Sequence, residues 1–116
     1  MSELTRFEDA EPYVPEGHHG VVNRLLVGLA EGGVSEVSVW HGRLEPGGGA
    51  DPHVHQGSLQ IYVGMTGEFM VSTGDGVGKT LGPGDAIVIP AGVEHDLENQ
   101  GGTVATLLVI SSPALR

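Results

Sequence analysis

Residues 47–60 read GGGADPHVHQGSLQ, and residues 84–99 read GDAIVIPAGVEHDLEN. In the first stretch His53 and His55 are separated by one residue, so on a β-strand both imidazoles point to the same side. Gln60 can approach the same point from the next strand, and His95 begins a later strand. Three neutral imidazoles and a carboxamide oxygen suit a divalent transition metal.

Short apolar runs alternate with turn clusters along most of the chain. Pro12, Pro15 and Gly17 break any helix, so residues 1–20 are predicted to be irregular. The following runs predict strands over residues 21–30, 35–45, 52–56, 59–65, 67–73, 78–82, 86–90, 94–99 and 103–111. The glycines and prolines between them supply the turns, among them a turn over residues 46–49. Short, evenly spaced strands without a helical stripe predict an all-β sandwich or barrel.

Length and composition exclude several classes of protein. The 116 residues suit one domain, and the absence of cysteine rules out a disulfide framework, a thiolate metal site and a cysteine nucleophile. Five Lys and Arg against fifteen Asp and Glu give a net charge of −10, which argues against nucleic acid or an anionic membrane as partner. No apolar run approaches the ~18 residues that cross a bilayer, and the N-terminus does not read as a signal peptide. We therefore expect a cytoplasmic protein.

The two quoted stretches resemble the two sequence motifs of the cupin superfamily. The first motif is matched, with Gln in place of the usual Glu, at Gly47, His53, His55, Gln60 and Gly67. The second motif is matched at Gly84, Pro90, Gly92, His95 and Asn99. The resemblance implies a single-domain cupin β-barrel over residues 21–116, a double-stranded β-helix of the jelly-roll type. It also implies one divalent transition metal per subunit (Fe, Mn, Ni, Co, Cu or Zn), held by His53, His55, Gln60 and His95.

Gln60 is the departure from the usual cupin motif. A neutral amide in place of a carboxylate leaves the full +2 charge on a bound divalent ion. Such an ion is a stronger Lewis acid, favours an anionic ligand and binds to the protein less tightly. Two alternatives stay open: Gln60 only forms hydrogen bonds beside the site, or the protein is a metal-free cupin.

Strand alternation assigns further side chains to the interior. Tyr62 shares a face with Gln60 and is a candidate catalytic acid or substrate hydrogen-bond donor; alternatively it is a buried tyrosine bonded to a backbone carbonyl. Trp40 and Gly42 share the inward face of residues 40–45 and are candidates for the substrate pocket. The alternatives are that Trp40 is plain core and that Gly42 marks a bulge.

Two neighbouring histidines precede the predicted barrel. His18 and His19 fall in a glycine-flanked loop, where we expect them to be solvated. The functional alternative is a lid over the mouth of the barrel.

Three functions remain compatible with the predicted site. The first is an enzyme that uses a divalent metal as a Lewis acid on a carbonyl, enolate or hydroxyl of a small organic substrate, as an isomerase, lyase or cyclase. The second is an Fe(II)-dependent dioxygenase, and the third is a non-enzymatic cupin that binds a small ligand. The resemblance also implies a homodimer formed through the sheet that carries residues 21–30.

Overall fold

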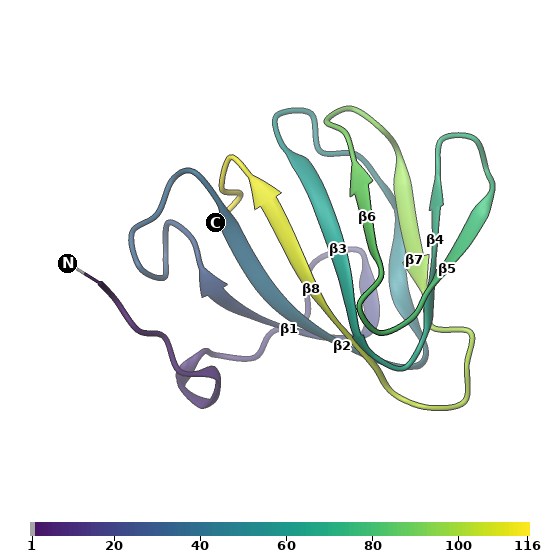
Figure 1. The fold of residues 1–116 in the computed structure, drawn as a ribbon, viewed down its shortest axis with the longest axis horizontal. Coiled ribbons are helices and arrows are strands. Elements are labelled where there is room, and N and C mark those ends of the chain that lie inside the picture. The colour runs from purple at the N-terminus through teal and green to yellow at the C-terminus, as the bar shows by residue number, and fades with distance from the viewer. Residues whose placement is uncertain (1) are drawn as a thin grey trace.

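A computed structural model describes residues 2–116 and shows an all-β fold with one short 3-10 helix. The elements are η1 (Phe7–Asp9), β1 (His18–Val27), β2 (Ser38–His53), β3 (Leu59–Thr66), β4 (Phe69–Thr73), β5 (Gly78–Leu81), β6 (Ala86–Ile89), β7 (His95–Glu98) and β8 (Ala105–Ser112). The strands form a nearly closed barrel, which confirms the predicted fold class (Figure 1).

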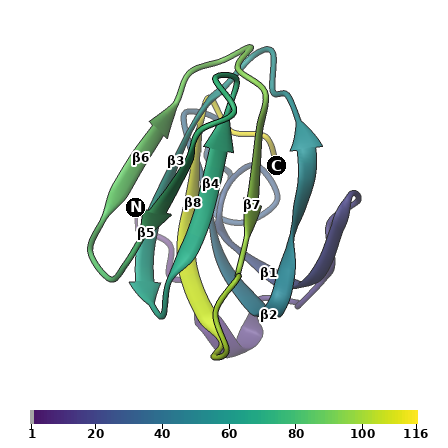
Figure 2. The same cartoon turned by 90° about the vertical axis from the view of Figure 1, so that its right-hand side faces the viewer.

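The long strand β2 joins the two halves of the barrel. Residues 38–44 pair with β8, and residues 49–53 pair with β7. One sheet therefore runs β1-β2-β8-β3-β6, and the other continues from β2 through β7 and β4 to β5. In Figure 2 β3 and β6 lie on the left and β7 and β2 on the right. All strand pairs are antiparallel.

The predicted turn over residues 46–49 is wrong, because β2 continues through it as one strand. Gly47 has a φ of 81°, in the left-handed region that favours glycine. A Cβ on Gly48 would clash with the carbonyl of Gly20, and one on Gly49 with that of Leu97. These glycines let β2 bend from one sheet to the other while staying close to the strands on both sides.

The N-terminal segment is more ordered than the sequence predicts. Residues 7–9 form η1, and β1 begins at His18 instead of residue 21 and ends at Val27 instead of residue 30. His18 and His19 therefore belong to a strand and not to a loop. The two strands predicted over residues 35–45 and 52–56 are one strand, β2, which ends at His53. The strands from β3 onward lie within a few residues of their predicted positions.

The hydrophobic core fills the space between the sheets. Its most buried large side chains, each at most 2% exposed, are Leu44, Phe69, Val71, Ile89 and Leu107. The predicted inward phase is confirmed for Trp40 in β2 and for Gln60 and Tyr62 in β3, all of which are buried. None of the helical residues in the described chain forms a segment long and apolar enough to span a membrane.

The end of the barrel that carries the histidines is the upper end in Figure 1. The last residues of β6 and β8 and the first residues of β3 and β7 meet there. Both sheets thus contribute side chains to this end.

Candidate metal centre

Three histidines converge at the upper end of the barrel. Antiparallel pairing of β2 with β7 sets His53 directly opposite His95, and their ring centroids are 4.2 Å apart. His55 lies two residues beyond the end of β2, with its ring 5.0 Å from His53 and 5.5 Å from His95. One potential ligand atom from each ring lies within 4.8 Å of those from the other two. The three-histidine group fits a metal ion.

Backbone carbonyls set the orientation of two of the rings. The Nδ1 of His53 is 2.7 Å from the carbonyl oxygen of Asp51, and the Nδ1 of His95 is 2.9 Å from that of Val93. A ring that donates its Nδ1 proton to a carbonyl keeps a lone pair on Nε2. In metal sites such a bond fixes the tautomer and the orientation of a histidine ligand.

Gln60 brings an oxygen to the histidines from the opposite sheet. Its side chain is 5% exposed, and its Nε2 donates to Ser111 Oγ at 3.0 Å. That bond turns Oε1 toward His95, whose Nε2 lies 3.0 Å away. With Nδ1 of His95 as the donor to Val93, two acceptor atoms face each other, an arrangement that favours a cation beside both. The residues present therefore fit a divalent metal, for which Gln60 Oε1 would be the fourth donor.

The surroundings of His55 and His95 keep these two imidazoles neutral. Burial and, to a smaller extent, the nearby imidazoles of His53, His95 and His18 together lower the pKa of His55 to about 4. Burial also lowers the pKa of His95, against the opposing effect of its bond to Val93. Metal binding needs deprotonated ligand nitrogens, so these two rings are ready to bind at neutral pH.

Tyr62 lies beside Gln60 on β3 and is 2% exposed. Its hydroxyl donates to Gln60 Oε1 at 3.4 Å, so its partner is a side chain and not a backbone carbonyl. Burial raises the pKa of Tyr62 well above its usual value, and the charge of Asp96 adds to this shift. The hydroxyl stays protonated at neutral pH and acts as a hydrogen-bond donor.

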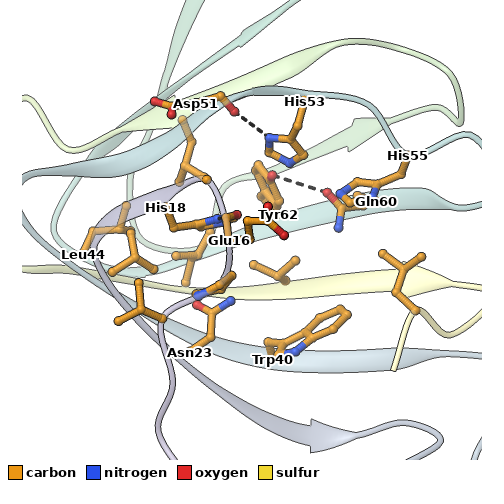
Figure 3. A pocket seen from close by; sticks show the side chains of 18 of the residues that line it. Glu16, His18, Asn23, Trp40, Leu44, Asp51, His53, His55, Gln60 and Tyr62 are labelled. Atoms are coloured by element: carbon orange, nitrogen blue, oxygen red, sulfur yellow. Dashed lines mark hydrogen bonds between the residues drawn. The ribbon is translucent and has the colours of Figure 1, made fainter.

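A cavity of about 470 Å³ opens beside the histidine cluster. Trp40 and Tyr62 line it, as the sequence predicts for the substrate pocket. In Figure 3 Trp40 lies across the cavity from His53 and His55. The indole N–H of Trp40 is buried without a hydrogen-bond partner.

Gly42 is not among the residues that line the cavity. A Cβ at this position would meet Leu107 Cδ2 at 3.0 Å and Asn23 Oδ1 at 3.2 Å. The absence of a side chain at Gly42 therefore makes room for Leu107 and Asn23, and these two residues line the cavity in its place.

His18, which we expected to be solvated, lines the cavity. It pairs in register with Ala50 of β2, which brings its ring to 5.9 Å from that of His53. Its Nδ1 is 3.0 Å from the carbonyl oxygen of Glu16, and the half-buried side chain lines the cavity. The sequence signal is weak because Gly20, with a φ of 61°, interrupts the alternation between His18 and the apolar residues that follow.

The neighbouring histidines stay outside the cluster. The side chain of His19 is 59% exposed, and the ring of His41 packs edge-on against Phe7 at 4.9 Å.

Comparison with known proteins identifies the domain. A family model described as a cupin domain matches residues 40–111, more than half of the chain. Germin-like protein subfamily T member 3 of Arabidopsis thaliana is 33% identical over 78 residues, which are 64% of this chain and 34% of that protein. The chain spans about a third of the length of the curated relatives it matches.

Solved structures share the fold over nearly the whole chain. An RmlC-like cupin from Shewanella frigidimarina NCIMB 400 has a TM-score of 0.80 and 26% identity, covering 100% of this chain and 95% of that one. The polyketide cyclase RemF from Streptomyces resistomycificus has a TM-score of 0.84 and 23% identity, covering 97% of this chain and 80% of that one. At the latter identity the likeness concerns the fold alone.

Proposed function

The chain belongs to the cupin family, and from this premise we propose that it is a metal-dependent enzyme acting on a small organic substrate. The reaction class is isomerisation, elimination or cyclisation at a carbonyl, enolate or hydroxyl group. Cyclisation is the reaction named for one structural neighbour, the polyketide cyclase RemF.

One observation carries the proposal. Three histidine ligand atoms lie within 4.8 Å of one another, Gln60 Oε1 lies 3.0 Å from that of His95, and His53, His55 and Gln60 line a 470 Å³ cavity. A metal held only by neutral ligands keeps its full charge next to a space that accommodates a substrate. A divalent ion there would supply Lewis-acid chemistry, lowering the pKa of a substrate group and stabilising developing negative charge.

The chain's own residues would supply the rest of the site. The carbonyls of Asp51 and Val93 hold two imidazoles in one tautomer. The protonated hydroxyl of Tyr62 would exchange its long 3.4 Å contact with Gln60 Oε1 for a hydrogen bond to a substrate oxygen. The apolar walls exclude water, which strengthens each of these interactions.

A general assay tests this proposal without knowledge of the natural substrate. Protein loaded anaerobically with zinc is incubated in D₂O with a panel of hydroxy ketones, and exchange of the proton next to the carbonyl is followed by NMR. We expect at least a tenfold faster exchange than with metal-free protein, and loss of that gain in His53→Ala. His19→Ala is the matched control, because that side chain is exposed outside the cluster.

The same assay, repeated with Fe(II)-loaded protein in the presence of O₂, separates the alternatives. Equal exchange in wild type and His53→Ala contradicts the proposal. Turnover that requires Fe(II) and consumes O₂ replaces it with the dioxygenase. Binding of a ligand with neither exchange nor O₂ consumption replaces it with the non-enzymatic binding protein.

A further inference from the structure

The wall of the cavity away from the histidines is apolar. Side chains from β1, β2, β7 and β8 form it: Val21, Trp40, Leu44, Leu97, Leu107 and Val109. The volume of this cavity is about 470 Å³. It falls within the range of ~300–1,000 Å³ typical of pockets for organic ligands. A two-carbon acid would leave most of this apolar surface without a contact.

Cationic side chains are almost absent from the lining. Among the described residues that line the cavity, Arg116 is the one Arg or Lys, and its guanidinium stacks over the ring of Tyr13 at 4.7 Å. Arg24 donates to the carbonyls of Phe7 and Ala10 at 3.1 and 2.8 Å, away from the site. Recognition of a second carboxylate or a phosphate calls for Arg or Lys at short range. The cavity does not provide an Arg or Lys side chain free to bind a second anionic group.

Acidic side chains at the mouth of the cavity also disfavour an anionic ligand. Glu16 and Asp51 both belong to the lining, and the Asp51 side chain is 73% exposed. With a net charge of −10 over the whole chain, a multiply charged anion would approach against the field of the protein.

Besides the indole N–H of Trp40, the amide of Asn23 is an uncommitted polar group among the apolar walls. The amide of Asn23 is 9% exposed and makes no side-chain hydrogen bond to another described residue. Figure 3 shows it on the side of the cavity opposite His53. An amide that lines a cavity without a side-chain partner favours a ligand that offers it an oxygen. The two polar ends of the cavity are therefore the histidine cluster and Asn23, with an apolar space between them.

We propose that the substrate is a ring-bearing, weakly charged oxygenated compound, and not a small dicarboxylate or a phosphorylated sugar. One oxygen of the compound lies at the histidine cluster, its ring contacts Trp40 and Val109, and a second oxygen hydrogen-bonds to Asn23. This substrate class rests on the proposed function, since it concerns the same site.

Ligand binding to the zinc-loaded protein tests the substrate class directly. Calorimetric titrations use 2-acetyl-1-naphthol as the ring-bearing probe and oxalate and glucose 6-phosphate as the competitors. We expect a 1:1 complex with the naphthol and a Kd at least tenfold below that of either anion. Val109→Phe fills the cavity and raises that Kd at least tenfold, whereas Val77→Phe, at an exposed position outside it, leaves the Kd unchanged.

A second readout does not depend on any variant. Trp40 is the single tryptophan of the chain and lines the cavity, so its fluorescence reports occupancy of the cavity in the wild-type protein. We expect saturable quenching by the naphthol at the calorimetric Kd. Equal or tighter binding of oxalate or the sugar phosphate overturns the substrate class, as does naphthol binding that leaves Trp40 fluorescence unchanged.

Failure of this inference is distinguishable from failure of the proposed function. Naphthol binding without proton exchange on any hydroxy ketone contradicts the proposed enzymatic function and supports the ring-bearing class of ligand. Exchange on small hydroxy ketones without naphthol binding supports the enzymatic function and contradicts the substrate class.

Discussion

Gln60→Glu is the substitution that most directly tests how the site binds a metal. The side chain is 5% exposed, and its Oε1 faces His95 Nε2 at 3.0 Å. The variant replaces the amide nitrogen that donates to Ser111 with an oxygen, and it adds a negative charge among neutral imidazoles. We expect the substitution to destabilise the metal-free protein and to strengthen the binding of a metal ion.

In the metal-free protein the new carboxylate is buried without a cation. Burial of an unpaired charge costs several kcal/mol, which donated hydrogen bonds from Ser111 and Tyr62 offset in part at about 1.5–3 kcal/mol each. We expect a net loss of about 1–3 kcal/mol at pH 8. At about 4–8 °C per kcal/mol for a domain of about this size, the Tm falls by roughly 5–15 °C.

In the metal-bound protein the carboxylate meets a divalent ion. One pair of unit charges at ~4 Å is worth about 4 kcal/mol at an effective dielectric constant of ~20, before the desolvation cost is subtracted. We therefore expect zinc affinity to rise at least tenfold, or about 1.4 kcal/mol. Saturating zinc then raises the Tm of the variant more than that of the wild type.

Calorimetric unfolding with and without zinc, together with competition against a chromophoric chelator, measures both effects. Gln100→Glu is the matched control, because it makes the same chemical change at an exposed position. If Gln60→Glu behaves like this control in both forms, the side chain does not face a metal and our interpretation of its hydrogen bonds is wrong.

Three further predictions concern pH, backbone conformation and assembly. The free energy of unfolding of the metal-free protein should fall as pH drops from 6.5 to about 4, because between these pKa values of His55 the folded state binds fewer protons than the unfolded chain; a decline equally steep in His55→Asn would contradict this. Gly67→Ala should destabilise the protein by about 1–2 kcal/mol in urea unfolding, since Gly67 has a φ of 67° and its Cβ would lie 2.6 Å from the carbonyl oxygen of Val104. Its control is Gly74→Ala, where no atom lies within 4 Å of the new Cβ, and equal effects would refute the argument. Light scattering should give twice the 12.0 kDa of one chain, and a wild-type monomer would exclude the dimer. Val88→Lys, on β6 of the sheet that includes β1, should shift the mass toward that of one chain, whereas the control Val77→Lys should not.

Alternation and turn residues predicted most of the fold. The inward phase of Trp40 and of Tyr62 could be read from the sequence because a strand has a side-chain period of two. The continuity of β2 through residues 46–49 could not be predicted, because Gly47 has the same signature in a turn as in a bend between two sheets. The β1 position of His18 was missed for a related reason, since its strand is held by pairing with a segment some thirty residues later.

The sequence by itself determined the ligand types and the local geometry of the site. His53 and His55 belong to one segment, and the motif spacing names Gln60 and His95 as their companions. Only the tertiary structure decided which way each group points: that His95 pairs across from His53, and that Ser111 turns the oxygen of Gln60 toward the histidines. It also decided that apolar side chains and Asn23 enclose the adjoining space, with one Arg and no Lys among the lining residues described. The physical reason is that these contacts join residues on different strands and sheets, and no local propensity encodes which side chains meet across the barrel.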